Sequence, residues 1–159
     1  MRILGKMSAL LVLAGLFGAG HANAQSTSRY CNDWLITGVY GFTIEGTKLA
    51  GPGPTGPQVG VALTEFDGRG SLKQIDAVTI GGVEVSDFTH PVATGTYTVN
   101  PDCTGTFTID FTDGRSSVST YFVVVDNGSE IDSVVEGVPP NSSGVIATRS
   151  IGRRRFGVF

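Results

Sequence analysis

Short segments in which apolar and polar residues alternate recur from Gly38 to Arg155, and each of them ends at a turn signal. Alternation with a period of two is the pattern of a β-strand that buries one face. No stretch after Tyr30 has the apolar spacing of a long amphipathic helix. The pattern therefore predicts an all-β protein.

Eight strands are predicted, with glycine, proline, asparagine and aspartate between them. They are Gly38–Lys48, Val59–Phe66, Ser71–Ile80, Val92–Val99, Gly105–Phe111, Ser116–Val125, Ser129–Glu136 and Gly144–Arg153, and a short segment Val83–Phe88 precedes the fourth. The stretch Gly51 to Pro57 is expected to lie outside any strand ladder, because proline lacks a backbone donor. The run Tyr121 to Val125 is apolar at every position, which predicts a strand covered on both faces.

The short connections favour an up-and-down meander over a Greek key. Closing eight strands on themselves removes the exposed edges and leaves an interior for side chains or one small ligand. We therefore predict a closed eight-stranded antiparallel up-and-down barrel. A β-sandwich is the alternative, because seven or eight strands at this spacing also fit that fold.

The N-terminal segment has the three parts of a secretory signal peptide. Two basic residues precede the apolar run Ala9 to Phe17, and Ala24 ends a cleavage site of small residues. The apolar run is too short to cross a bilayer, which takes roughly 20 residues. Cleavage near Ala24 predicts a secreted or periplasmic protein. Two sequons, at Asn127 and Asn141, would matter only in a host that glycosylates such proteins.

Removal of residues 1–24 would leave a lead-in at residues 25–37 and a single barrel domain at residues 38–159. The remaining chain has nine Lys and Arg against fourteen Asp and Glu, a net charge of −5. Nucleic-acid binding requires a basic surface, so no nucleic-acid partner is expected. Membrane insertion is not expected either. A lipid-facing last strand would need apolar residues where Arg153 and Arg155 stand.

Cys31 and Cys103 are the only cysteines of the chain. In an oxidising compartment such a pair is expected to form a structural disulfide. Closing a loop of about 70 residues would stabilise the fold by on the order of 4 kcal/mol in the chain-entropy model. The bond would attach the lead-in to the turn at Asn100–Asp102.

The remaining chain has little conventional catalytic equipment. His21 lies within the predicted signal peptide, so His90 is the only histidine after cleavage. One histidine cannot build a multi-histidine metal site, and no cysteine and histidine cluster has ligand spacing. Neither a phosphate-binding glycine motif nor a nucleophile elbow occurs. No metal and no organic cofactor is therefore expected.

Three titratable residues are weak catalytic candidates. His90 precedes Pro91 in an irregular segment, where it is either a surface residue or a general acid and base at a cavity mouth. Asp76 interrupts an apolar strand face, and Glu65 ends the face formed by residues 59, 61 and 63. A carboxylate inside a barrel needs a partner or acquires a raised pKa, whereas on the outer face it is simply solvated.

Aromatic residues on the predicted strands are candidates for lining a hydrophobic cavity. They are Tyr40, Phe42, Tyr97, Phe107, Phe111 and Tyr121. The same residues would also fill a solid core, and the sequence does not choose between these arrangements.

Three segments carry a resemblance to a known family. Gly38–Gly46, Phe66–Gly70 and Gly95–Thr106 resemble secreted microbial barrels related to allene oxide cyclases. These belong with the calycin-like barrels, which include dirigent proteins and spirotetronate cyclases. The resemblance covers nearly all of the chain after cleavage, and strand and turn residues carry most of it. It implies an apolar interior that binds one hydrophobic molecule and, in an enzyme, cofactor-free ring closure by confining the substrate to one conformer. No catalytic residue aligns by position.

Lipocalins are more distant calycins that begin their first strand with Gly-x-Trp and place an arginine near the end of the barrel. The corresponding residues here are Gly38-Val39-Tyr40, with Arg149 or Arg153. This weaker similarity predicts that Tyr40 closes one end of the barrel.

Two functions follow from these observations. The first is a barrel that binds a small apolar molecule, with a cofactor-free cyclase or isomerase as its enzymatic form. The second is a non-enzymatic structural or interaction module with a filled barrel. A pocket of roughly 300 Å³ or more is expected for the first and a fully packed interior for the second.

Overall fold

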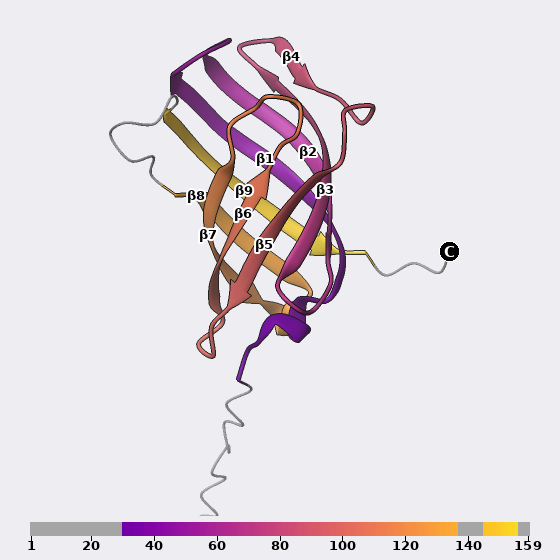
Figure 1. The fold of residues 1–159 in the computed structure, drawn as a ribbon. Coiled ribbons are helices and arrows are strands. Elements are labelled where there is room, and N and C mark those ends of the chain that lie inside the picture. The colour runs from indigo at the N-terminus through magenta and orange to yellow at the C-terminus, as the bar shows by residue number, and fades with distance from the viewer. Residues whose placement is uncertain (1–29, 137–144, 156–159) are drawn as a thin grey trace, which may run out of the picture.

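Every strand of the barrel pairs antiparallel with its neighbour in the meander, and the last strand returns to pair with the first (Figure 1). The computed structural model describes residues 30–136 and 145–155. The barrel strands are β1 (Gly38–Ala50), β2 (Gly56–Phe66), β3 (Ser71–Ile80), β5 (Ala93–Val99), β6 (Thr104–Asp110), β7 (Val118–Val125), β8 (Glu130–Val135) and β9 (Val145–Arg154). The prediction of a closed eight-stranded up-and-down barrel is confirmed, and the alternative sandwich is wrong.

The remaining strand, β4 (Val83–Ser86), lies outside the barrel and pairs with β3. Of the ten residues of β3, those that pair with β5 are Ser71 to Gln74. Further along β3, Val78 to Ile80 pair with β4 instead. The hydrogen-bonded ladder between β3 and β5 therefore stops partway along the barrel.

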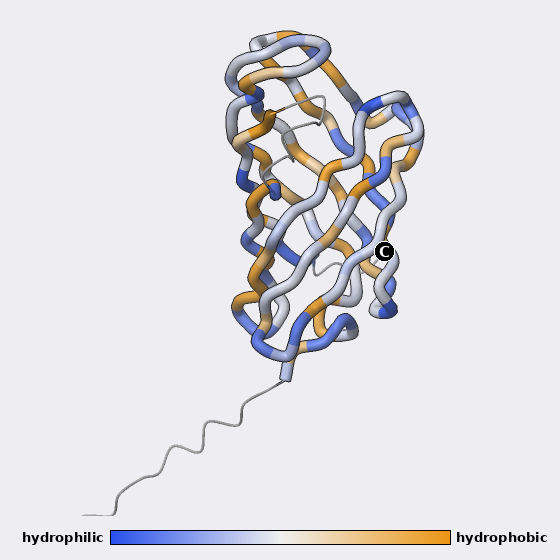
Figure 2. Tube along the Cα trace, turned by 60° about the vertical axis from the view of Figure 1, so that its left-hand side comes forward, coloured by the Kyte–Doolittle hydropathy of each residue, from blue (hydrophilic) through white to orange (hydrophobic). Residues whose placement is uncertain are grey.

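Alternation along the strands determines which side chains face the interior. On β3, Leu72, Gln74, Asp76, Val78 and Ile80 are all buried, and the residues between them are more exposed. Figure 2 shows the corresponding mixture of apolar and polar residues along the chain. The face predicted for this strand is the inner face of the barrel.

β2 has its more apolar row on the outside. Val59 and Val61 are about half exposed on the outer face, whereas Ala62 and Thr64 are buried within the barrel. Ala62 is paired with Phe42 of β1, and both residues border the cavity described below. Hydrophobicity alone therefore does not identify the inner row of this strand.

The outer face of β7 corrects a second expectation. Tyr121 and Val123 point outward and are 51% and 43% exposed, while Phe122 and Val124 are buried. The apolar run of this strand is thus not covered on its outer face within the described chain. Strand propensity explains why apolar residues occupy this exposed face, since β-branched and aromatic residues favour extended backbone whichever face they occupy.

The proline-rich connection is shorter than the sequence predicts. Gly56 and Pro57 belong to β2 and pair with Lys48 and Thr47 of β1. Pro57 has no backbone donor, but its carbonyl oxygen accepts a hydrogen bond from Gly81 N at 2.8 Å. The expectation that all of the stretch Gly51 to Pro57 lies outside the ladder is therefore wrong at its last two residues.

The predicted disulfide between Cys31 and Cys103 is present and spans 72 positions. The backbone nitrogen of Cys31 also donates to Pro101 O at 3.3 Å, so the lead-in is fixed to the expected turn. A short 3-10 helix, η1 (Asp33–Ile36), follows the cysteine and lies across one end of the barrel (Figure 1). The predicted signal peptide and Asn141 lie outside the described residues.

Candidate functional site

One end of the barrel is closed, and Tyr40 is the centre of the closure. Its ring is fully buried, and its hydroxyl donates to the carbonyl oxygen of Gly128. The Arg154 guanidinium donates to the same hydroxyl from Nε at 3.0 Å and Nη2 at 2.8 Å, and it also bonds the carbonyl of Leu35 on η1. Burial raises the pKa of Tyr40, and the bond from Arg154 opposes that rise.

The arginine of the closed end differs from the two expected from the lipocalin pattern. Arg149 and Arg153 point outward, where they pair with Glu45 at 3.2 Å and Glu130 at 2.8 Å. Side chains of adjacent strand residues point to opposite faces, so only Arg154 can reach the interior beside Tyr40. Its guanidinium carbon lies 5.3 Å from the centre of the Tyr40 ring.

Tyr97 strengthens the same end of the barrel. Its hydroxyl accepts a hydrogen bond from Gly68 N at 2.8 Å and donates to Asp33 O at 3.2 Å. Its ring packs edge-on against Phe66, with 5.0 Å between the ring centres. Tyr40 and Tyr97 therefore form the floor of the barrel and do not line an open space.

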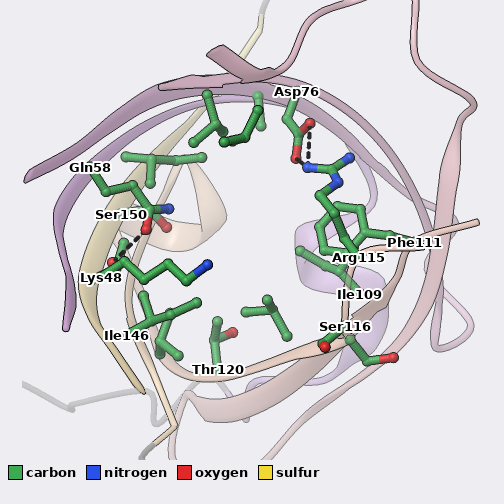
Figure 3. A pocket seen from close by; sticks show the side chains of 18 of the residues that line it. Lys48, Gln58, Asp76, Ile109, Phe111, Arg115, Ser116, Thr120, Ile146 and Ser150 are labelled. Carbon is green, nitrogen blue, oxygen red and sulfur yellow. Dashed lines mark hydrogen bonds and ion pairs between the residues drawn. The ribbon is translucent and has the colours of Figure 1, made fainter. Parts of the chain in front are cut away.

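A cavity of about 750 Å³ occupies the interior between this floor and the opposite end (Figure 3). Its inner wall is apolar and includes Phe42, Ile44, Ala62, Val78, Phe107 and Ile109. Residues of the β1–β2 and β6–β7 connections line its mouth. The interior is thus far from filled, and the cavity volume lies above the roughly 300 Å³ expected as a minimum for a binding barrel.

Three of the predicted lining aromatics, Phe42, Phe107 and Phe111, do border the cavity. Phe42 can lie flat against β9 because the residue opposite it is Gly152, where a Cβ atom would come within 2.4 Å of the ring. Tyr121 lies outside the barrel and its hydroxyl donates to Glu136 at 2.7 Å, so this residue was wrongly placed among those facing the interior.

Asp76 is the predicted carboxylate that the structure places in the cavity wall. Its side chain is only 5% exposed, and both of its oxygens accept hydrogen bonds from Nη1 of Arg115 at 3.1 Å. Arg115 belongs to the β6–β7 connection and also pairs with Asp113 at 2.8 Å. Its guanidinium carbon lies 3.8 Å from the centre of the Phe111 ring. The buried carboxylate therefore has the partner that burial requires.

Hydroxyl and amide groups form a polar strip along the other side of the cavity. The Ser133 and Ser150 hydroxyl oxygens are hydrogen-bonded at 2.6 Å, and the Thr148 hydroxyl donates to Gln58 Oε1 at 3.4 Å. These residues come from β8, β9 and β2. The cavity can consequently offer hydrogen-bonding groups to a ligand along this strip and apolar contacts along residues such as Ile44, Val78 and Ile109.

Glu65 and His90 lie apart from the cavity lining. Glu65 is exposed on the outer face of β2. His90 lies in the β4–β5 connection, where its Nδ1 is 3.0 Å from Asp87 Oδ1 and 3.2 Å from Asp87 N. Hydrogen bonds from Thr89 and His90 lower the pKa of Asp87 to about 2. Of the three catalytic candidates, only Asp76 borders the cavity.

Arg115 and Lys48 border the cavity mouth and were not among the residues predicted for the site. Lys48 could have been found by continuing the alternation of Tyr40, Phe42 and Ile44 along β1 for two further inward positions. No alternation pattern includes Arg115, because it follows the hairpin turn Asp113-Gly114. The position of such a connection relative to the barrel depends on the tertiary structure.

Comparison of the chain with protein-family models, curated proteins and solved structures gives no match. Within residues 30–136 and 145–155, no helix is long and apolar enough to cross a membrane. Over the same ranges, no group of three or more potential metal ligands occurs. The assignment of a function therefore depends on the cavity itself.

Proposed function

We propose that this protein is a secreted barrel that binds one small, largely apolar molecule in its interior. The observation that carries the proposal is the cavity of about 750 Å³ between the Tyr40 floor and the open end. Ligand sites are commonly 300–1,000 Å³, mostly apolar, and supplied with a few polar groups. A barrel that served only as a structural module would gain stability by filling such a space.

The disulfide supports the extracellular or periplasmic part of the proposal. Disulfides persist in oxidising compartments and are rare in the cytosol. The bond between Cys31 and Cys103 anchors the segment that leads into η1, so oxidation helps to hold the closed end together. The signal-peptide pattern before Ala24 points to the same compartment.

The test is whether the cavity captures an apolar molecule. Native mass spectrometry of the protein after exposure to a lipid extract should show a bound small molecule, and a fluorescent apolar probe should be displaced by it. Ala62→Phe and Ile44→Trp place larger side chains in the cavity and should abolish binding. Ala77→Phe adds a ring to the outer face of β3 and is the matched control.

Each outcome bears directly on the proposal. Binding by the wild type and by Ala77→Phe, but by neither cavity variant, would support it. No capture by the folded wild type, or equal binding by all variants, would refute it. Circular dichroism of each variant identifies any that fails to fold. Two cavity positions are substituted so that the test still works if one of the two variants fails to fold.

We further propose that the bound molecule can be a substrate whose ring closure is guided by confinement. The resemblance to allene-oxide-cyclase-like and dirigent-like barrels supports this extension, as does the combination of a shaped cavity with a buried carboxylate, Asp76, in its wall. Holding a reactive chain in one conformer can remove much of the entropic barrier to cyclisation. The test is the stereochemistry of the product formed from a reactive acyclic substrate. A racemic product at the uncatalysed rate would refute cyclase activity without affecting ligand binding.

A further inference from the structure

We propose that the cavity selects an apolar molecule that ends in a carboxylate, and that Lys48 binds this carboxylate at the mouth. The inference deepens the proposed function and rests on it. It begins with the position of Lys48 on β1. Tyr40, Phe42, Ile44 and Gly46 occupy the preceding inward positions of the strand, so Lys48 continues this row at the open end.

The Lys48 side chain extends toward the lumen (Figure 3). Its ammonium donates to the carbonyl oxygen of Pro52 in the β1–β2 connection. In the described part of the chain, no carboxylate forms an ion pair with it. Among the described residues, half-buried Lys48 thus has a carbonyl oxygen and no carboxylate as the partner of its ammonium.

The other two basic residues that border the cavity are already paired. Arg115 has two carboxylate partners, Asp76 and Asp113. Arg149 bonds Glu45 on the outer surface at 3.2 Å. A ligand anion would have to displace a carboxylate from either arginine, whereas at Lys48 it would displace none. Lys48 is therefore the favoured position for an anionic group.

A second donor, Gln58, lies on the neighbouring strand β2, one inward position along from the residue paired with Lys48. Gln58 of β2 and Thr148 of β9 are both paired with Gly46, the inward residue that precedes Lys48 on β1. Because Gly46 has no side chain, the Thr148 hydroxyl reaches across it to donate to Gln58 Oε1 at 3.4 Å. That bond occupies the amide oxygen and directs the amide nitrogen of Gln58 into the lumen (Figure 3).

The ammonium and the amide together suit the two oxygens of a carboxylate. Hydrogen bonds between charged groups are about twice as strong as neutral ones, and the low dielectric of the cavity wall strengthens them. A phosphate fits less well, because Asp76 and Asp113 share a single arginine and leave a net negative charge at the same mouth. A singly charged head group with an apolar body along Ile44 and Phe107 matches this arrangement.

The experiment compares dodecanoic acid, dodecanol and dodecylamine at pH 7, below their micellar concentrations, by titration calorimetry or probe displacement. The wild type should bind the acid about tenfold more tightly than the alcohol, and the amine most weakly. Lys48→Met should remove the preference for the acid while leaving the affinity for the alcohol unchanged. Lys73→Met, which removes a lysine from the outer face of β3, should behave as the wild type.

Two further variants keep the inference falsifiable if Lys48→Met fails to fold. Lys48→Arg should retain the preference for the acid, and Lys48→Glu should reverse it in favour of the amine. Equal affinities of the wild type for the acid and the alcohol would overturn the inference while the proposed function stands. An unchanged acid preference in Lys48→Met or Lys48→Glu would also overturn it. Failure of the wild type to bind any of the three molecules would overturn the proposed function as well.

Discussion

Asp76 on β3 and Arg115 in the β6–β7 connection form an ion pair across the part of the wall where β3 no longer pairs with β5. Arg115 Nη1 lies 3.1 Å from both oxygens of Asp76. The β3–β5 ladder ends at Gln74, two residues before Asp76, and at Ala93 on the other strand. A side-chain interaction thus connects two segments at the cavity mouth that the backbone ladder does not join.

The two halves of this pair should respond differently to substitution. Arg115→Met leaves Asp76 buried without a charged partner, and the expected loss is about 3 kcal/mol in the free energy of unfolding. Asp76→Asn should cost only about 1 kcal/mol, because Arg115 keeps Asp113 and the amide oxygen remains an acceptor. Urea unfolding at pH 7 measures both losses. Equal losses would contradict the asymmetry that the second carboxylate predicts.

The pKa of Asp113 should depend on Arg115. The side-chain hydrogen bond from Arg115 holds the pKa of Asp113 below 3.8. Arg115→Met should therefore raise this pKa, as followed by carboxyl NMR titration. The pKa of Asp102 is lowered by bonds from Thr104 and should not move, which makes Asp102 an internal control. An unchanged pKa of Asp113 would show that the pair is absent in solution.

The same shift predicts how stability varies with pH. A carboxyl whose folded-state pKa is depressed stabilises the fold above its unfolded value, and that contribution disappears as pH falls through the folded value. Arg115→Met removes the contribution of Asp113, so its destabilisation relative to the wild type should shrink as the pH is lowered from about 5 to about 2. A gap that widens toward acid would contradict this sign.

Tyr40→Phe should destabilise the closed end. It removes the group that Arg154 binds and leaves the buried Gly128 carbonyl without its donor, at an expected cost of about 2 kcal/mol. Tyr121→Phe is the matched control, because that hydroxyl lies on the exposed outer face, where it bonds to Glu136. Its cost should stay below about 0.5 kcal/mol. Thermal and urea unfolding of both variants would measure the difference.

Replacing both cysteines with alanine should cost about 4 kcal/mol, because the disulfide closes a loop spanning 72 positions. The loss should be localised first at the lead-in and η1, which the bond attaches to the barrel. Hydrogen exchange would then show reduced protection at Leu35 N and Thr37 N before the barrel strands. Reduction of the wild type should reproduce the effect, and unchanged protection at these amides would contradict it.

Most of the fold could be predicted from local patterns in the sequence. Strand positions, turn positions and the meander could be predicted because alternation and turn chemistry act between residues close together in the chain. The disulfide was predictable for a different reason, since the chain contains only two cysteines. Asp76 was identified from the apolar row that it interrupts, and the structure places it in the cavity wall.

Other features depended on how the barrel closes. The more apolar row of β2, at Val59 and Val61, faces outward, and the alternate row with Ala62 and Thr64 faces inward. Arg154 reaches the interior and Arg153 does not, since a shift of one residue on a strand moves a side chain to the opposite face. Such choices follow from register and packing, which involve strands far apart in the sequence.

The amino-acid sequence was therefore sufficient to predict the strands and their order in the barrel. The tertiary structure was needed to show that the interior is hollow, that Arg115 crosses to Asp76, and that Lys48 faces the lumen with no carboxylate partner among the described residues. The physical reason is that alternation is a property of neighbouring residues. A cavity and its charges, by contrast, arise only when eight strands close and long side chains from separate connections meet at one end.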